Sequence, residues 1–403
     1  MRRTYGAVLA AGLVIAAGII VGSCCVPETV VSDVPRFAYA GNQNSNDISA
    51  YTVDNSTGAL ATVPGSAFAG PTGPRDAVVE LLGKYLYVAN GGTTETAGSG
   101  VSGYSIDPTT GALSQLPGSP FAGGSGPRGI ALHPSGKFLY TADRQSNSVS
   151  GYAINTSTGG LTAIAGSPFT IPAEGEESEP GPQQLTVDPS GRFLYVSNHL
   201  TGDISGFTIN ATTGALTLMS GSPFSDQETP DSNIQPFALV VVPSGQFLYV
   251  TNHGSSTLSV YSVNAGTGAL TPIAGSPFDI TIGEDDEQCD SEPYGVSVSP
   301  SGQFLFVADN GCDAVSVFSL NAMTGVPTLT PNSPFSVVAG DCFAGVNDDT
   351  LDATGRFLYV ADASCGAVTA FSVDPTTGDL TEIAGSPFPA GSGPYGVAVS
   401  RIN

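Results

Sequence analysis

Residues 293–309 read PYGVSVSPSGQFLFVAD, and this stretch decides the fold. Val296 and Val298 alternate with small or polar residues, which predicts a half-buried strand. A Pro-Ser-Gly turn follows, and the apolar run 304–307 predicts a second strand antiparallel to the first. Residues 314–335 then supply two further strands around a Thr-Gly turn and end in Ser-Pro-Phe. Four consecutive strands therefore form one unit.

This unit recurs along the whole chain. The aromatic residue that opens the second strand occurs seven times, at Phe37, Tyr85, Phe138, Phe193, Phe247, Phe304 and Phe357. The Thr-Gly turn also recurs seven times, from Thr57-Gly58 to Thr377-Gly378. A fixed repeat of about 50 residues with four strands is typical of propeller blades, which cannot bury their faces alone. The sequence therefore predicts an all-β fold, a seven-bladed β-propeller of four-stranded antiparallel blades.

The two ends of the repeat region, 36–403, predict how the ring closes. Residues 36–42 match a second strand that has no first strand before it. Residues 393–403 match a first strand that has no second strand after it. We expect the C-terminal strand to complete the first blade, because this closure leaves no unpaired sheet edge.

Residues 1–23 resemble a bacterial signal peptide. A basic start precedes an apolar run at 7–21, which is short for a membrane-spanning helix. The run leads into Val-Gly-Ser-Cys, which is similar to a lipobox, so Cys24 is the expected lipidation site. An ordinary signal peptide cleaved nearby is the alternative. Residues 24–35 would form a tether, and we expect an exported protein that is lipid-anchored in a bacterial cell envelope.

The composition excludes several classes of partner. The formal net charge is −24, and the chain has only 11 Lys and Arg residues, so it lacks the basic surface that binds nucleic acid. Attachment to an anionic membrane through a basic patch is excluded for the same reason, so the lipid would be the only membrane contact. We expect a monomer whose partner, a small molecule, glycan or protein, binds at the rim of the central channel.

Four cysteines predict two disulfides. Cys289 and Cys312 occupy the same repeat positions as Cys342 and Cys365, and both intervals are 23 residues. The first cysteine of each pair lies in the loop that enters the blade, and the second follows the second strand, so both project from one face. An exported location permits the bonds Cys289–Cys312 and Cys342–Cys365. The alternative is a four-thiolate zinc site, although the close Cys-x-x-Cys spacing of such sites is absent.

Candidate functional residues belong to two rings at one face. The inner strand of a blade begins, and the second strand ends, on the same face. The first ring follows the inner-strand proline and contains Arg75, Arg128, Gln183, Phe237, Tyr294, Asn347 and Tyr395. The second ring follows the second strand and contains Gln43, Gly91, Arg144, His199, His253, Asn310 and Ala363. The residue before each member of the second ring is Asn or Asp, which predicts a structural cap for the loop backbone.

Each of these side chains has a functional and a structural interpretation. The arginines could clamp a carboxylate or phosphate, or form salt bridges with acidic loops. His199 and His253 could act as general acid–base groups or metal ligands, or be solvated residues of the rim. Residues 347–349 read Asn-Asp-Asp where other blades carry Tyr-Gly-Val, and a buried Asp there needs a partner or a cation. A water cluster is the alternative.

No cofactor is predicted. Calcium would suit the acidic loops at 174–179, 226–231 and 284–292, because it prefers oxygen ligands. None of these loops carries the DxDxDG motif of a calcium loop, and repulsion among solvated acids explains their composition equally well.

The repeated segments of the second strand resemble the YVTN-type repeats of the lactonase family. They read SGKFLYTAD, SGRFLYVSN, SGQFLYVTN and TGRFLYVAD, and GPRGIALHPSG precedes the first of them. The resemblance covers residues 36–403. This family includes 6-phosphogluconolactonase-type and muconate-cycloisomerase-type propellers. Family enzymes often carry Gly-Pro-Arg-His on an inner strand and Asn-Glu after a second strand. Arg128 matches this pattern, but Gly129 stands at the histidine position, and His199 and His253 stand at the glutamate position.

Two hypotheses follow from this resemblance. The favoured one is an exported lipoprotein whose rim is a rigid scaffold for a ligand or partner, because the family's proton-transfer residues are replaced. The alternative is a lactone hydrolase or lactonising isomerase in which His199 or His253 moves protons. In either case the predicted ligand-binding residues are Arg75, Arg128, Arg144, Gln183, Tyr294, Asn347, Asp348, Asp349 and Tyr395.

Overall fold

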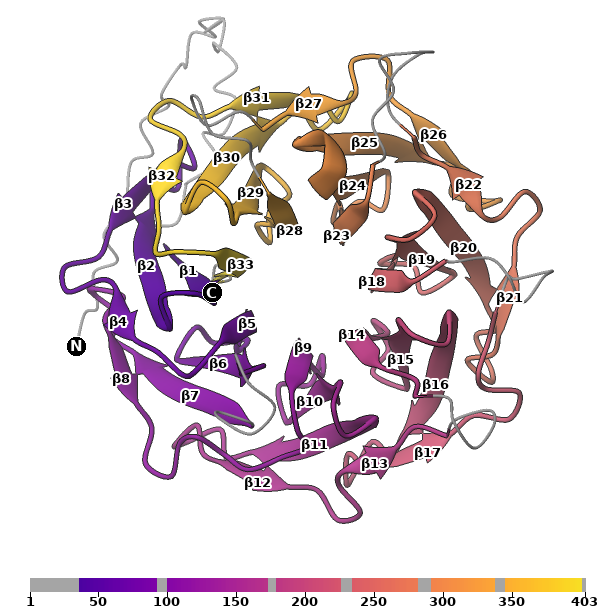
Figure 1. Ribbon diagram of the computed structural model, residues 1–403, viewed down its shortest axis with the longest axis horizontal. Coiled ribbons are helices and arrows are strands. Elements are labelled where there is room, and N and C mark those ends of the chain that lie inside the picture. Colours follow the sequence, from indigo (N-terminus) through magenta and orange to yellow (C-terminus); the bar gives the residue numbers. More distant parts are fainter. Residues whose placement is uncertain are drawn as a thin grey trace, which may run out of the picture. The chain divides into compact units, whose positions relative to one another are not determined.

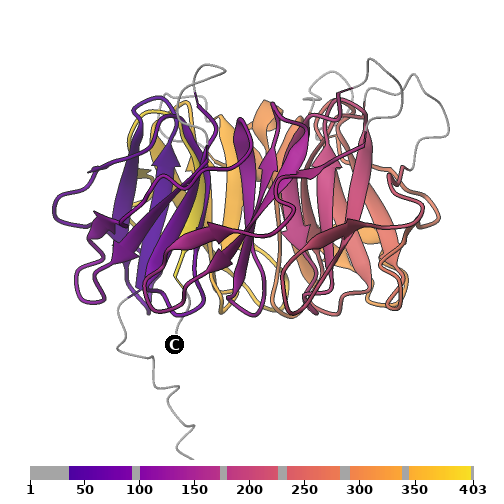
Figure 2. The same ribbon diagram turned by 90° about the horizontal axis from the view of Figure 1, so that it is seen from below.

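The computed structural model describes residues 36–92, 100–172, 179–225, 234–281, 291–337 and 345–400, all within the unit Asp33–Asn403. Residues 1–35 lie outside the described part, so the signal peptide, the tether and the lipidation of Cys24 stay predictions. The described residues form seven antiparallel sheets arranged as blades in a ring (Figure 1). Seen from the side, the strands run between the two faces of this ring (Figure 2). The seven-bladed fold predicted from the repeat is therefore confirmed.

Each blade follows one strand order from the ring centre outward. The inner strands are β33 (Pro394–Val399), β5 (Pro74–Val79), β9 (Pro127–Leu132), β14 (Pro182–Val187), β18 (Pro236–Val241), β23 (Pro293–Val298) and β28 (Val346–Leu351). The second strands are β1 (Arg36–Asn42), β6 (Tyr85–Asn90), β10 (Phe138–Asp143), β15 (Phe193–Asn198), β19 (Phe247–Asn252), β24 (Phe304–Asp309) and β29 (Phe357–Asp362). The second strands are buried along their whole length, because each has a sheet neighbour on both edges and another blade on both faces.

The third strands are β2 (Asp47–Val53), β7 (Val101–Ile106), β11 (Ser148–Ile154), β16 (Asp203–Ile209), β20 (Thr257–Val263), β25 (Ala314–Leu320) and β30 (Ala367–Val373). The fourth strands are β3 (Leu60–Thr62), β8 (Leu113–Gln115), β12 (Leu161–Ala163), β17 (Leu216–Leu218), β21 (Leu270–Pro272), β26 (Pro327–Leu329) and β31 (Leu380–Glu382). The short helix η2 (Asn310–Cys312) follows β24. None of the helices in the described ranges has the length and apolarity needed to span a membrane.

The outer edge of each blade is made in two pieces. After the fourth strand, five blades add a two-residue strand that also pairs with the third strand: β4 (Phe68–Ala69), β13 (Phe169–Thr170), β22 (Phe278–Asp279), β27 (Phe335–Ser336) and β32 (Phe388–Pro389). Single bridges at Phe121 and Phe224 replace it in the other two blades. The serine between the two pieces accepts a backbone N–H of the third strand in all seven blades, as Ser333 does from Val317 at 2.8 Å. The repeated Ser-Pro-Phe motif therefore fixes the blade edge.

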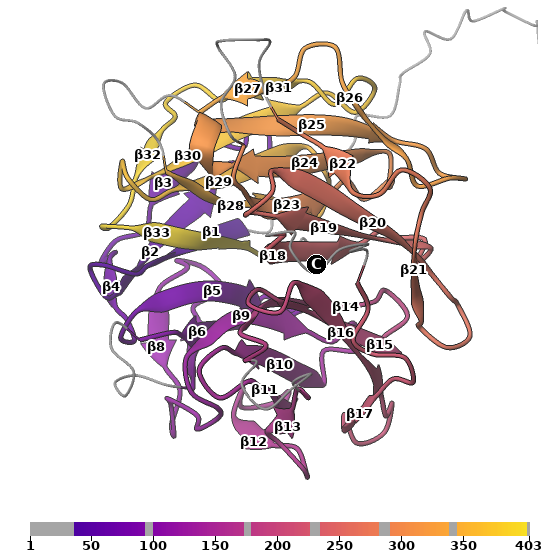
Figure 3. The ribbon, with the colours of Figure 1, turned by 45° about the vertical axis from the view of Figure 1, so that its right-hand side comes forward.

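The ring closes through the two ends of the described chain. Strand β33 pairs antiparallel with β1, in a register that places Ala38 opposite Val399 and Gly41 opposite Gly396. Figure 3 shows β33 lying beside β1, although the two strands are the last and first of the ring. The predicted completion of the first blade by the C-terminal strand is confirmed.

Neighbouring blades are joined by a repeated tyrosine. A tyrosine two residues after the aromatic residue that opens the repeat of the second strand donates its hydroxyl to the carbonyl of the Thr-Gly turn in the next blade, at 2.6–2.9 Å. The six pairs are Tyr39–Gly111, Tyr87–Gly159, Tyr140–Gly214, Tyr195–Gly268, Tyr249–Gly325 and Tyr359–Gly58. The seventh position is Phe306, which has no hydroxyl, so the contact between its blade and the next lacks this bond.

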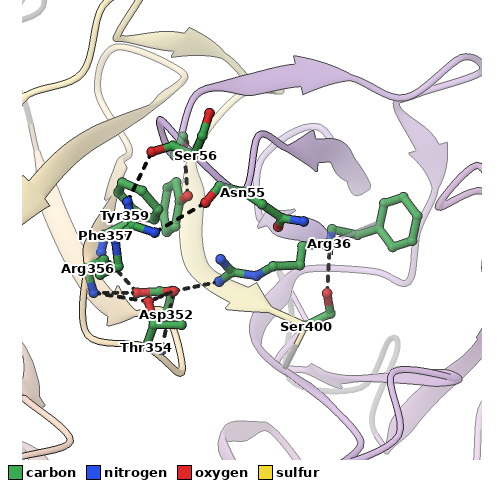
Figure 4. Close-up of polar contacts among 11 residues, drawn as sticks. Arg36, Asn55, Ser56, Asp352, Thr354, Arg356, Phe357, Tyr359 and Ser400 are labelled. Atoms are coloured by element: carbon green, nitrogen blue, oxygen red, sulfur yellow. Dashed lines mark hydrogen bonds and ion pairs between the residues drawn. The ribbon is translucent and has the colours of Figure 1, made fainter. Parts of the chain in front are cut away.

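A buried ion pair reinforces the junction between the last and first blades (Figure 4). Arg36 at the start of β1 donates to Asp352, which follows β28, with Nη2 and Oδ2 2.8 Å apart. The two side chains are 1% and 0% exposed, and this is the only salt bridge among the residues that the structure describes. Asp352 also accepts the backbone N–H groups of Arg356 and Phe357, at 2.8 and 2.9 Å.

Candidate functional site at the mouth of the ring

The seven inner strands surround the ring axis, and each contacts the inner strand of the next blade (Figure 1). Six of the seven begin with proline, which suits a first strand position because it needs no N–H donor there. Directly after this start, the pairing of each inner strand with its second strand shifts register. Such irregularities redirect side chains. We call the side chains at this end the mouth: Arg75, Arg128, Arg144, Gln183, His199, Phe237, His253, Tyr294, Asn347 and Tyr395.

One side of the mouth is cationic. The side-chain oxygen Oε1 of Gln183 accepts a hydrogen bond from Arg128 at 3.1 Å and another from Arg144 at 2.9 Å. Arg144 also donates to the backbone oxygen of Gly181, at 3.4 Å. Two guanidinium groups of one blade are thus held against one neutral oxygen atom of the next blade.

The third arginine of the mouth, Arg75, lies over the ring of Tyr395, with its guanidinium carbon 4.8 Å from the ring centroid. The Nε atom of Arg75 is buried and has no hydrogen-bond partner. Tyr395 also lies within reach of Gln183, whose Nε2 atom is 3.4 Å from the tyrosine hydroxyl. The predicted residues Arg75, Arg128, Arg144, Gln183 and Tyr395 therefore form one connected group.

No carboxylate among the described residues neutralises the charge of this group. Among the described residues, none of the three arginines has a carboxylate within salt-bridge distance. Burial, together with the nearby charges of Arg75 and Arg144, lowers the pKa of Arg128 to about 10. The alternative of salt bridges to the acidic loops stays untested, because most residues of those loops lie outside the described ranges. A local excess of positive charge in a chain of net charge −24 favours an anionic ligand.

The other side of the mouth is aromatic. Phe237 and Tyr294 lie with ring centroids 4.2 Å apart, and His253 contacts Tyr294 edge-on at 4.9 Å. His199 lies 6.1 Å from Phe237 and 6.2 Å from His253, measured between ring centroids. The structure therefore brings together the two histidines that share one repeat position.

Burial favours the neutral form of both histidines. Burial lowers the pKa of His199 to about 4, and the charges of Arg144 and His253 act in the same direction. Burial also lowers the pKa of His253. The Nδ1 atom of His199 is buried without a hydrogen-bond partner. An unprotonated imidazole nitrogen can accept a proton, and the neighbouring arginines make it a weaker base.

A layer of acids follows one residue further along the inner strands. Asp76 accepts hydrogen bonds from the backbone N–H of Ala77 at 2.7 Å and from Gln184 at 2.9 Å. Asp348 lies close to it, because a Cβ atom added to Gly396 would be 3.3 Å from Asp76 Oδ1 and 3.4 Å from Asp348 Oδ2. Burial raises the pKa of Asp76 to about 6, and burial together with Asp76 raises the pKa of Asp348 well above its usual value.

The remaining predicted acids and amides have structural contacts. Asn347 donates to the backbone oxygen of Pro394 and accepts from Asn310, both at 3.4 Å. Asp349 is only 3% exposed and accepts the hydroxyl of Ser297, so the structure does not bring it to the mouth. Asn347 therefore remains part of the mouth, and Asp349 is buried between neighbouring inner strands.

Sequence reasoning missed Asp76 and Gln184. Gln184 lies over Gly129, where an added Cβ would be 1.8 Å from its Oε1 atom, and reaches Asp76 two blades away. The space at the family's histidine position is thus occupied by this amide. Asp76 and Asp348 stand at the same repeat position, and this signal in the sequence could have identified them as a pair.

The Asn and Asp residues before the second ring have a structural role, as predicted, but mostly with other partners. Asn198 donates to Asp203 and Ser205 on the third strand of its own blade, and Asn252 donates similarly to Thr257 and Ser259. A loop backbone N–H is accepted at Asp362, from Cys365 at 3.4 Å. The expected capping of the loop backbone is therefore wrong for most of these residues, which instead tie two strands together.

The disulfide pairing stays a prediction. Cys312 and Cys365 are disulfide-bonded cysteines, but Cys289 and Cys342 lie outside the described residues. Within the described ranges, no group of three or more His, Cys, Asp and Glu residues is placed to hold a metal ion. Most residues of the acidic loops lie outside these ranges, so calcium binding there is untested.

The fold and the mouth define a seven-bladed β-propeller with a cationic and imidazole-containing site at one face of the ring. The sequence model of the family described as "Lactonase, 7-bladed beta-propeller" matches residues 26–119, 99–281 and 280–395. The chain belongs to this family.

Several relatives have names that state an activity. The chain is 25% identical over 250 residues to a 6-phosphogluconolactonase of Pectobacterium carotovorum, a match that covers 58% of this chain and 67% of the relative. It is 34% identical over 167 residues to a probable 6-phosphogluconolactonase of Arthroderma benhamiae, covering 39% of this chain and 40% of the relative. A match to the 6-phosphogluconolactonase of Formosa agariphila spans 38% of that protein's length.

Solved structures with the same fold include two bacterial proteins. A putative 6-phosphogluconolactonase of Bacteroides uniformis is 18% identical, with a TM-score of 0.73, and the match covers 91% of this chain and 100% of that chain. The periplasmic gluconolactonase of Pseudomonas aeruginosa is also 18% identical, with a TM-score of 0.69, covering 92% of this chain and 100% of that chain. At these identities the structures show a common fold alone.

Proposed function

We propose that this protein is a lactone hydrolase whose active site is the mouth. Membership of the lactonase family and the names of the relatives support this function over the non-catalytic scaffold that the sequence alone favoured. The observation that carries the proposal is His199, a neutral imidazole with an unpaired nitrogen beside an unneutralised arginine group.

The chemistry needs a base and a stabiliser for negative charge. In lactone hydrolysis, water attacks the ester carbonyl, the ring C–O bond breaks, and a hydroxy acid forms. The imidazole of His199 would accept the proton of the attacking water and return a proton to the leaving alkoxide. A guanidinium of the mouth would stabilise the oxyanion that develops on the carbonyl oxygen. His253 would keep His199 in place as part of the aromatic side.

The arginine group favours lactones that carry a negative charge. The three arginines have no carboxylate partner among the described residues, so they can bind a phosphate or carboxylate substituent. Guanidinium groups form paired hydrogen bonds with both kinds of oxyanion. The relatives named 6-phosphogluconolactonases support a phosphorylated sugar lactone as the first substrate to test. The aromatic side, with Phe237 and Tyr294, would contact the apolar face of the substrate ring.

The test measures hydrolysis of a lactone panel by titration of the released acid. Arg128→Ala should lower kcat/KM for an anionic lactone by roughly ten- to a hundredfold, because it removes hydrogen bonds from a charged donor. His199→Gln should lower kcat by roughly a hundredfold or more, as expected for a lost general base. The exposed Arg192, which donates to the turn carbonyls of Ala265 and Gly266, supplies the matched control Arg192→Ala.

The results separate the two hypotheses. Turnover that falls in the Arg128 and His199 variants but not in the Arg192 variant supports catalysis at the mouth. If the wild-type protein hydrolyses no lactone faster than the His199 variant does, the hydrolase proposal is wrong, and the scaffold hypothesis would stand in its place.

A further inference from the structure

Gln183 occupies the position in the mouth that an anionic group would be expected to fill. Its Oε1 atom is the shared acceptor for Arg128 and Arg144, at 3.1 and 2.9 Å. The side chain is 3% exposed, so it is fixed by the protein and not by solvent. Its orientation follows from chemistry, because an arginine has no acceptor and can only face the oxygen end of the amide.

A carboxylate at this position would fit the same contacts. Glutamate has the length of glutamine, and its two oxygens could accept from both arginines, while the Tyr395 hydroxyl could donate to it in place of accepting from Nε2. It would also cancel part of the repulsion among Arg75, Arg128 and Arg144, which contributes to the low pKa of Arg128. For the free protein, glutamate would therefore be the more stabilising residue.

We infer that Gln183 is a specificity-determining residue, which holds the two guanidinium groups in place while leaving their charge for the anionic group of the ligand. A neutral acceptor orders Arg128 and Arg144 but neutralises neither of them. The site keeps unsatisfied positive charge at a cost in stability, which is a common trade-off at binding sites. The inference rests on the proposed function, since it assigns the anion to the lactone substrate.

The test compares the wild-type protein with Gln183→Glu in full-length form. Inorganic phosphate and gluconate serve as anion probes, with dissociation constants measured by calorimetry. Gln183→Glu should weaken binding of both by roughly tenfold or more, because a fixed carboxylate competes for the same cations. The same variant should melt at an equal or higher temperature than the wild type. Gln145→Glu is the matched control, since Gln145 is an exposed neighbour of Arg144 and receives the same change in charge.

Two lactones that share one ring extend the test to turnover. Gln183→Glu should raise KM for 6-phosphogluconolactone by roughly tenfold or more beyond any change in KM for the uncharged gluconolactone. A residue with only a structural role would alter both substrates equally or neither. Equal losses on the two lactones, an unchanged affinity for both probes, or no probe binding by the wild type would overturn the inference. Probe binding that Gln183→Glu weakens, without any lactone turnover, would refute the hydrolase proposal and still support the role of Gln183.

Discussion

The ion pair between Arg36 and Asp352 predicts an unequal response to the loss of either partner. Without Asp352, the guanidinium of Arg36 would remain at 1% exposure with no opposite charge, and its Nε atom already lacks a partner. Removing one partner of a buried pair in this way costs about 3–5 kcal/mol. We therefore expect Asp352→Asn to lower the free energy of unfolding by about that amount.

The reverse change should cost less. In Arg36→Met, Asp352 would keep its hydrogen bonds from the backbone of Arg356 and Phe357. Asp188 shows that such a carboxylate can exist without an arginine, because it is 5% exposed and its partners among the described residues all belong to its own turn. The expected cost is about 1.5–3 kcal/mol, the range for a hydrogen bond to a charged group.

Equilibrium unfolding in guanidinium chloride measures both losses, with Asp188→Asn as the control for the shared turn. If Asp352→Asn lowers the free energy of unfolding by more than Asp188→Asn does, the difference is the cost of leaving the Arg36 charge buried without a partner. The double variant Arg36→Met/Asp352→Asn should be more stable than the sum of the single effects implies, because it leaves no buried charge without a partner. The argument from an unpaired buried charge would fail if Arg36→Met or Asp188→Asn lowered the free energy of unfolding by as much as Asp352→Asn does.

Three further outcomes are expected. Tyr249→Phe should lower the free energy of unfolding by about 1 kcal/mol, whereas Phe306→Tyr should raise it by a similar amount if the new hydroxyl reaches the carbonyl of Gly378; thermal melting checks both. Burial raises the pKa of Asp309 to about 7, so the folded state binds more protons than the unfolded state between about pH 4 and pH 7, and stability should fall as pH rises through that interval. Asp309→Asn should flatten this decline in melts taken across the range, and an unchanged slope would contradict the assignment. For lactone turnover, the acid limb of kcat/KM should lie near pH 4, the pKa of His199, and a limb at pH 6.5 would show that another group is the base.

The fold could be predicted because every blade packs in the same way and therefore needs the same residue types at the same positions. A buried second strand, a tight Thr-Gly turn and a Ser-Pro-Phe edge each need particular residue types, and these appear at a constant spacing in the sequence. The contact from the Tyr359 hydroxyl to Gly58 was not predicted, although the tyrosine itself is part of the repeat. Its partner lies in the next blade, and no spacing within one repeat reveals that contact.

The site was predictable only in part. Ring positions placed Arg75, Arg128 and Arg144 at one face, because strand direction alone determines the face. The shared acceptor at Gln183 depends on how far each side chain reaches around the ring, and the sequence does not contain that information. The salt bridges to acidic loops that were the alternative for the arginines stay untested, because most of those loops lie outside the described residues.

The repeat also explains why function is concentrated in residues that differ between blades. A position such as Tyr249 contacts the next blade, so any blade that lost it would weaken a junction of the ring. The residue after the start of the inner strand lies where the pairing with the second strand shifts register. Its side chain is therefore less constrained by regular strand pairing than those of its neighbours. There the seven blades carry two arginines, one glutamine, one asparagine and three aromatic residues. Seven equal strands thus supply seven unequal side chains around one axis, and a polar, asymmetric ligand such as a charged lactone needs that inequality to bind in one orientation.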